Sequence, residues 1–71
     1  MELINIHKVK DGAIVRFQHS LIPYMKVCNG QTGVGGVVDI GTGQYFTTPQ
    51  IVSYYGEMVE VVADDIYEWM R

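Results

Sequence analysis

Apolar residues in this chain come in short runs separated by polar residues and glycine, a pattern typical of antiparallel strands. The runs cover residues 13–17, 22–27, 37–40, 44–46 and 57–62. Asp11 and Gly12 form a turn signal before the first run, and residues 41–43 form another. The pattern therefore predicts a β-meander over residues 13–62, preceded by a short lead-in strand near residues 3–6.

The period of two along each run predicts which side chains face the core. The predicted inward residues are Val15, Phe17, Met25, Val27, Val38, Ile40, Val59 and Val61. On this prediction Tyr24 is half-exposed and Lys26 lies in solvent. Pro23 has no amide hydrogen to give to a ladder, so we expect it at a strand start or on an edge.

Residues 48–56 support two interpretations. Thr48 suits an N-cap, Pro49 the first helical position and Gly56 the residue after a helix, which favours a short helical turn. The segment is also rich in β-formers, namely Ile51, Val52, Tyr54 and Tyr55. The pattern leaves both open.

A second helix is predicted at the C-terminal end, over residues 64–71. Asp64 is placed to cap it, and Asp65 lies in the first turn, where the helix dipole favours acids. Ile66, Trp69 and Met70 share one face, which we expect to dock on the sheet or on a second subunit.

The composition, 48% apolar and 18% charged, excludes a disordered chain. We expect a single domain of mainly β class over residues 1–71, a small antiparallel, strongly bent sheet or open barrel of 4–5 strands with the C-terminal helix. A core this small supplies about 3–5 kcal/mol. Cys28 is the single cysteine, so no intrachain disulfide adds to it, and we expect a homo-oligomer.

No apolar run approaches the length of about 20 residues that spans a bilayer, and the first residues lack a basic signal region. We therefore expect no membrane association. A cytoplasmic location is the simplest for a chain with a single cysteine and no secretion signal.

The net charge of −3 is unevenly distributed: residues 1–38 carry +2 and residues 39–71 carry −5. The cations of the first part are Lys8, Lys10, Arg16 and Lys26. Sequence-independent binding of nucleic acid needs clustered basic residues, and these four cations are few for such a surface. The charge of −5 on residues 39–71 fits better with an acidic face that binds a basic protein.

The glycine-rich stretch over residues 29–36 superficially resembles phosphate-binding loops, but a strand follows it where such loops open a helix. We expect a flexible hairpin loop that can serve as a contact surface. Cys28, His19 and Asp39 have no spacing that indicates a catalytic set, and His7, His19 and Cys28 have none that indicates a metal site. The prediction is a protein without catalytic activity, cofactor or metal.

Aromatic residues are numerous after residue 24, and they are interleaved with acids and threonines, where base stacking would need lysine and arginine. Core packing accounts for part of them. Tyrosine and tryptophan are also enriched at protein interfaces, and Tyr54 and Tyr55 beside Met58 could anchor a partner. The predicted interface comprises Tyr54, Tyr55, Glu57, Met58, Glu60, Asp64, Asp65 and Trp69.

The order of four short segments, at residues 9–17, 24–27, 38–43 and 59–62, resembles that of small bacteriophage and mobile-element proteins. These have a turn, a strand, a Tyr-x-Lys-Val-like strand, a Val-Asp-x-x-Thr-Gly-like turn and a final strand. The resemblance implies a small β-barrel of the Src-homology type and carries over no catalytic residue. The segment 48–56 and the C-terminal helix depart from it.

Small acidic phage proteins often block host enzymes, as anti-CRISPR proteins do. The leading hypothesis is a non-catalytic phage-type accessory protein that binds a host protein and inhibits a host defence or nucleic-acid enzyme. One alternative is a nucleic-acid-binding barrel that uses the four N-terminal cations. Another is a small-ligand binder assembled at a subunit interface.

Overall fold

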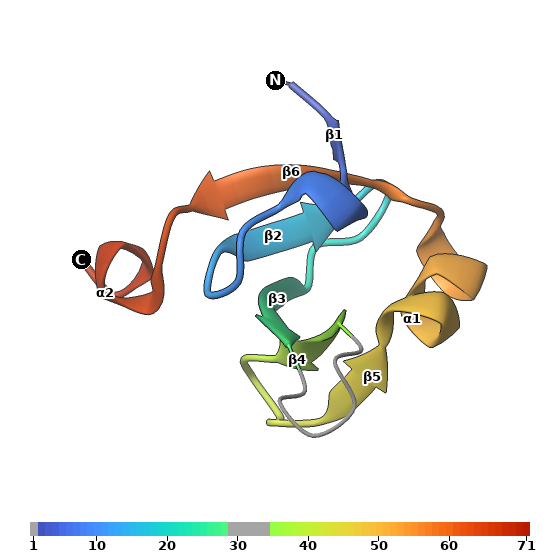
Figure 1. Ribbon diagram of the computed structural model, residues 1–71. Helices are drawn as coiled ribbons and strands as arrows, with labels where there is room; N and C mark the ends of the chain where they lie inside the picture. The colour runs from blue at the N-terminus through green and yellow to red at the C-terminus, as the bar shows by residue number, and fades with distance from the viewer. Residues whose placement is uncertain (1, 29–34) are drawn as a thin grey trace.

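The computed structural model describes residues 2–28 and 35–71 and shows one antiparallel sheet with three short helical segments (Figure 1). The elements are β1 (Ile4–Asn5), η1 (Ile6–Lys8), β2 (Ile14–Phe17), β3 (Pro23–Cys28), β4 (Gly35–Asp39), β5 (Tyr45–Thr47), α1 (Thr48–Tyr55), β6 (Met58–Ala63) and α2 (Ile66–Trp69). The meander predicted over residues 13–62 holds from β2 to β5, but β6 leaves it and pairs with β2. β3 begins at Pro23 as expected.

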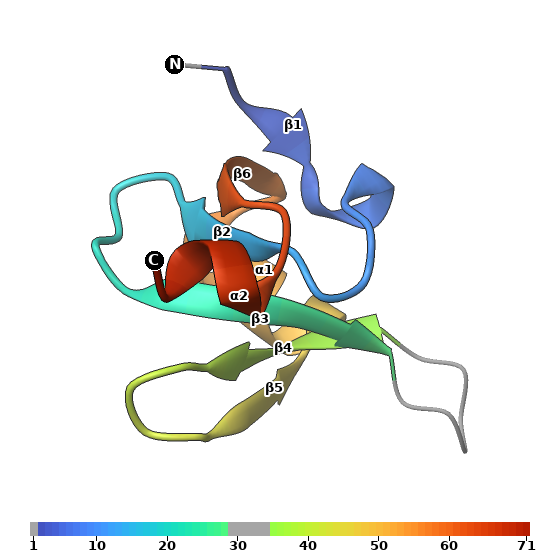
Figure 2. The ribbon, with the colours of Figure 1, turned by 90° about the vertical axis from the view of Figure 1, so that its left-hand side faces the viewer.

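The strand order is β1-β6-β2-β3-β4-β5, and every neighbouring pair is antiparallel. The last strand, β6, returns across the molecule to lie between β1 and β2. Figure 2 shows β3, β4 and β5 below β2 and β6, so the sheet is strongly bent and stays open. The predicted fold class is confirmed. The sheet has six strands where 4–5 were predicted, and this number includes two very short strands, β1 and β5.

The core lies inside the bend of the sheet. Its fully or almost fully buried side chains include Ile6, Val9, Val15, Phe17, Tyr24, Val37, Ile51 and Val59. The Phe17 ring stacks on Tyr55 at a centroid distance of 5.5 Å and meets Tyr24 edge-on at 5.6 Å. The predicted burial of Val15, Phe17 and Val59 is confirmed, and Val61 packs against the cluster.

The predicted faces of β3 and β4 are wrong. Tyr24 is 3% exposed and Lys26 8% exposed, whereas Met25 and Val27 are only partly buried. Val15 lies directly opposite Tyr24 in the β2–β3 register. Directly opposite residues point to the same face of a sheet, so the buried Val15 places Tyr24 on the inward face as well.

The same register continues into β4, where Val37 lies opposite Lys26. Val37 is therefore fully buried, while Val38 and Ile40 are half-buried. The ammonium group of Lys26 lies 3.5 Å from Asp11 Oδ1, and the aliphatic part of the lysine accounts for its place beside the core.

Residues 48–56 adopt the helical alternative, with the cap one residue earlier than predicted. Thr47 is the N-cap, and its Oγ1 accepts a hydrogen bond from the Gln50 N–H at 3.3 Å. Thr48 lies inside the helix and is buried. Gly56 ends α1 with a φ of 84°, a left-handed conformation that glycine adopts without strain.

The cap of α2 also lies one residue from its predicted position. Asp65, not Asp64, is the N-cap, and its Oδ1 accepts a hydrogen bond from the Glu68 N–H at 2.8 Å. No residue of α2 is buried, and the element that it contacts most is β6. The expected docking of Ile66, Trp69 and Met70 on the sheet is therefore incomplete.

Candidate functional site

The predicted interface residues divide between the two ends of β6. Tyr54, Tyr55, Glu57 and Met58 lie where α1 leads into the strand, and we call them the α1 end. Glu60, Asp64, Asp65 and Trp69 lie along the strand and beyond it, towards α2. We call the segment from Asp64 to Met70 the α2 end. A six-residue strand is about 20 Å long, so α1 and α2 stand on opposite sides of the molecule (Figure 1).

At the α1 end most of the predicted contact area is already used within the chain. Tyr55 stacks on Phe17 and packs against the core. Glu57 Oε2 accepts a hydrogen bond from Asn5 Nδ2 at 2.9 Å. This leaves Tyr54, 77% exposed, and Met58, 37% exposed, as the apolar groups available to a partner.

Tyr24 links the α1 end to the core. Burial raises the pKa of its hydroxyl to about 12, and the hydrogen-bonding side chain of Tyr55 and the charge of Asp39 act in the same direction. Tyr24 and Tyr55 thus form one internal cluster with Phe17, and this cluster has a structural role.

At the α2 end large apolar side chains remain uncovered. Tyr67 is 77% exposed, Met70 76% and Trp69 38%. The predicted interface included Trp69 but not Tyr67 or Met70, although Met70 belongs to the helix face that was expected to dock on the sheet or on a second subunit. The signal was present, because a short amphipathic segment that follows the last strand of the sheet has little core to pack against.

Acidic groups lie on the same segment as these apolar side chains. Asp64, Asp65 and Glu68 are exposed on α2 and the turn before it. A cleft of about 400 Å³ is lined by Glu2, Ile4, Glu60, Val61 and Asp64. Within it, Glu60 Oε1 accepts a hydrogen bond from Arg16 Nη2 at 2.7 Å, so part of its charge is balanced.

A second cleft, of about 470 Å³, was not predicted. It is lined by Leu3, Arg16, Phe17, Gln18, His19, Ser20, Leu21 and Glu60. Leu21 at its rim is 86% exposed, and His19 has a left-handed backbone with a φ of 68°. The apolar pair Leu21 and Ile22 directly before Pro23 was the available signal, since a proline at a strand start leaves the preceding residues outside the ladder.

The four N-terminal cations do not form a common patch. Lys26 is buried beside Asp11, and Arg16 is paired with Glu60. Lys8 and Lys10 are the members of this set that are exposed. The arrangement gives no support to a nucleic-acid surface built from these residues.

Cys28, His19 and Asp39 do not come together as one set, because Cys28 is remote from Asp39. Cys28 and Asp39 lie at opposite ends of the β3–β4 ladder, opposite Gly35 and Tyr24 respectively. Asp39 Oδ1 accepts hydrogen bonds from the backbone N–H groups of Gly41 and Thr42 and so holds the predicted turn.

Within residues 2–28 and 35–71, no group of three or more histidine, cysteine or acidic side chains is arranged to hold a metal ion. Most of the glycine-rich stretch 29–36 lies outside the described residues. No helix in the described part of the chain is long and apolar enough to cross a membrane. Comparison with protein-family models, curated proteins and solved structures yields no match.

Proposed function

We propose that this chain is a non-catalytic protein-binding module and that its contact surface is the α2 end. The observation that carries the proposal is the exposure of Tyr67 and Met70, which lie three residues apart and are therefore neighbours on the surface of α2 and its C-cap. Soluble monomers rarely leave contiguous apolar patches uncovered unless the patch binds something. Tyrosine, tryptophan and methionine are the residues enriched in the buried centres of interfaces.

The charges around the patch indicate the kind of partner. Asp64, Asp65 and Glu68 give the α2 end a negative rim. A basic protein surface would be attracted to this rim during encounter, while the aromatic residues would supply most of the affinity. The partner we propose is therefore a protein with a basic face that contains an apolar pocket.

The specific role we propose is inhibition of a host defence or nucleic-acid enzyme. Such enzymes hold nucleic acid in basic grooves, and an acidic module that occupied a groove would exclude the substrate. The resemblance to small phage proteins supports the same role by analogy. It requires the protein to act in the cytoplasm of the host cell.

A matched pair of tyrosine substitutions tests the surface. Tyr54 and Tyr67 are both 77% exposed, one at the α1 end and one at the α2 end. We expect Tyr67→Ser to lower the recovery of a bacterial partner in affinity capture by about tenfold, the scale of an interface anchor. Tyr54→Ser should leave recovery unchanged.

Both variants should keep the thermal stability of the parent chain, because both side chains are exposed. Equal capture by Tyr67→Ser and the parent chain would contradict the α2 end. Loss with Tyr54→Ser alone would move the surface to the α1 end.

A further inference from the structure

Part of β6 has a free edge in the described structure. On one side β2 accompanies the strand from Val59 to Ala63. On the other side β1 pairs only with Met58 and Val59. Among residues 2–28 and 35–71, the part of β6 from Glu60 onward therefore has a partner strand on one side only.

The hydrogen-bond pattern identifies the backbone groups that face this edge. The Ile6 N–H donates to the Glu57 carbonyl at 2.8 Å, which makes these residues a hydrogen-bonded pair of the antiparallel ladder. Such pairs recur at every second residue, so Val59 bonds Ile4 and the next residue with groups on this side is Val61. The N–H and the carbonyl of Val61 therefore point to the free edge.

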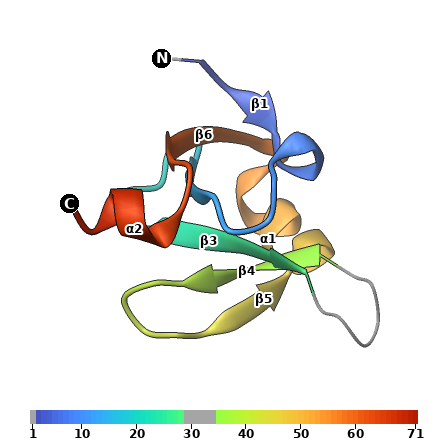
Figure 3. The ribbon, with the colours of Figure 1, turned by 60° about the vertical axis from the view of Figure 1, so that its left-hand side comes forward.

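The chain itself does not continue the ladder. In the register of β1 and β6, Glu2 would lie opposite Val61, but pairing ends at Ile4. Figure 3 shows the N-terminal residues leading away from β6. The position beside Val61 is thus left open by the course of the chain.

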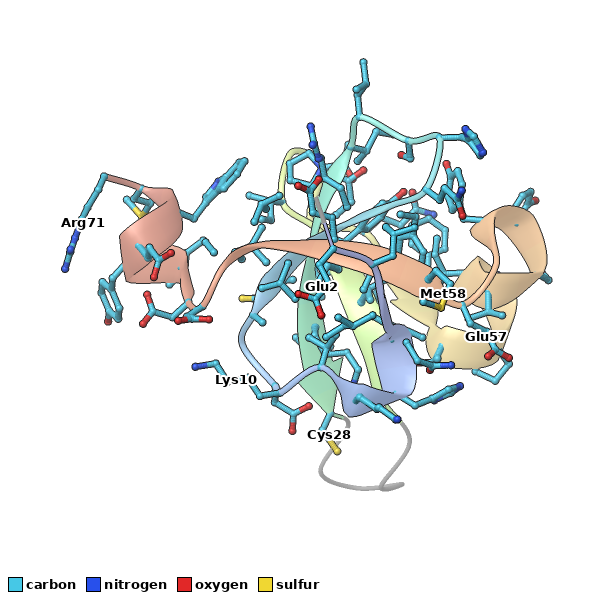
Figure 4. The ribbon with its side chains drawn as sticks, turned by 90° about the horizontal axis from the view of Figure 1, so that it is seen from above. Glu2, Lys10, Cys28, Glu57, Met58 and Arg71 are labelled. Atoms are coloured by element: carbon cyan, nitrogen blue, oxygen red, sulfur yellow. The ribbon has the colours of Figure 1, made fainter. Side chains whose placement is uncertain are left out.

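A cleft lies where the missing strand would run. The cleft of about 400 Å³ has Ile4 and Val61 as its apolar residues and Glu2, Glu60 and Asp64 as its charged ones. Seen from above in Figure 4, Glu2 projects over the middle of β6 and Glu57 and Met58 over its start, and of these three only Glu2 lines the cleft. An extended chain in this cleft would meet both the backbone groups of Val61 and a set of acids.

We propose that the free edge of β6 binds an extended basic segment of a partner protein as an added strand. Backbone hydrogen bonds to Val61 supply affinity in this recognition mode, and alternate side chains supply specificity. Lysine or arginine side chains of the segment would lie beside Glu2 and Asp64. The inference rests on the proposed function and deepens it, because it states how the partner is held next to α2.

A second copy of the same chain is a poorer occupant. Two such edges placed together would bring like charges near one another, since Glu2, Glu60 and Asp64 line each of them. Like charges opposite each other destabilise strand pairing, and acids on an edge are one means by which proteins prevent it. A basic segment would instead bring opposite charges together, which stabilises strand pairing.

The test uses a synthetic probe, the capped peptide Lys-Val-Lys-Val-Lys-Val, titrated into isotope-labelled protein. We expect the Val61 amide resonance to shift and its hydrogen exchange to slow. The same peptide N-methylated at every residue keeps its charges but loses its backbone donors, so it should bind about tenfold more weakly. This comparison needs no altered protein.

Charge variants give the second arm. The pair Glu2→Gln and Asp64→Asn should weaken peptide binding by roughly fivefold at low salt. Glu57→Gln is the matched control, because it removes one charge at the far end of β6 and keeps an oxygen that can accept from Asn5. The control should bind the peptide like the parent chain.

Three results would overturn the proposal. These are absence of binding, equal binding of the N-methylated peptide, or a Val61 signal that still changes on dilution in the double variant Tyr67→Ser and Met70→Ser, which would show a second copy on the edge. If capture depends on Tyr67 but the peptide fails, strand addition is wrong and the α2 surface stands. If the peptide binds at Val61 while Tyr67→Ser captures the partner like the parent chain, strand addition stands and the α2 surface is wrong.

Discussion

At the scale of single residues, Tyr24 is the clearest case in which the environment changes the chemistry of a side chain. It is 3% exposed, its ring meets Phe17 edge-on, and its pKa is raised to about 12. The folded protein therefore holds this proton more tightly than the unfolded chain, where the pKa is 10.0. The stabilising contribution is complete below pH 10 and is lost as the pH rises towards 12.

This difference predicts an alkaline transition that depends on Tyr24. The free energy of unfolding should fall by about 2–3 kcal/mol between the two pKa values because of this group alone. Urea unfolding at several pH values should show a steeper fall for the parent chain than for Tyr24→Phe, which has no proton to lose. Parallel curves for the two proteins would show that Tyr24 titrates normally when folded.

At the scale of elements, the adjacent threonines of α1 have opposite roles. Thr47 caps the helix, whereas Thr48 Oγ1 is buried without a hydrogen-bond partner in the described structure. We expect Thr47→Val to lower the free energy of unfolding by about 1 kcal/mol through the lost cap. Thr48→Val should be neutral or stabilising, because it removes an unsatisfied buried hydroxyl.

Chemical denaturation of the two valine variants measures this difference directly. Each substitution replaces one hydroxyl with a methyl group in neighbouring positions, so each is the control for the other. A larger loss for Thr48→Val would mean that its hydroxyl has a partner in the folded protein and that the cap lies where the sequence pattern first indicated.

Glycine requirements also belong to this scale, and they differ within β4. A Cβ on Gly36 would lie 2.6 Å from the Phe46 carbonyl oxygen and 2.7 Å from the Tyr45 ring. At Gly35 the nearest atom is the ammonium nitrogen of Lys26, at 3.1 Å, which is the end of a flexible side chain. The close approach of β5 therefore needs glycine at position 36 specifically.

At the scale of the whole molecule, the small core and the uncovered helix favour association. The chain has a mass of 8.0 kDa and leaves Tyr67 and Met70 about three-quarters exposed. Without its partner, the protein is expected to cover these side chains by pairing with another copy through α2. The predicted homo-oligomer would then use the surface proposed for the partner.

Sedimentation at increasing concentration tests this expectation. We expect masses above 8.0 kDa at tens of micromolar protein, and a shift to the monomer mass for the double variant Tyr67→Ser and Met70→Ser. A monomer at every concentration would contradict self-association. Association that persists in the double variant would place the contact elsewhere.

The candidate site could be predicted only in part from the sequence. The interface prediction joined residues that β6 holds at opposite ends, because distance along the chain does not show that a six-residue strand separates them. It counted Tyr55 as a contact residue, although the ring stacks on Phe17. It omitted Tyr67 and Met70, whose exposure follows from the position of α2 beyond the sheet.

Local chemistry alone located the turns, and it placed the N-cap of each helix to within one residue, although it left open whether residues 48–56 are helical and made α2 two residues too long at each end. Gly12 and Gly56 have φ values of 92° and 84°, Asp39 closes its turn, and Pro23 starts β3. The tertiary structure decided the faces of β3 and β4, because Tyr24 points inward only when its strand is in register with Val15. The free edge of β6 has the same origin, since it depends on where β1 stops pairing.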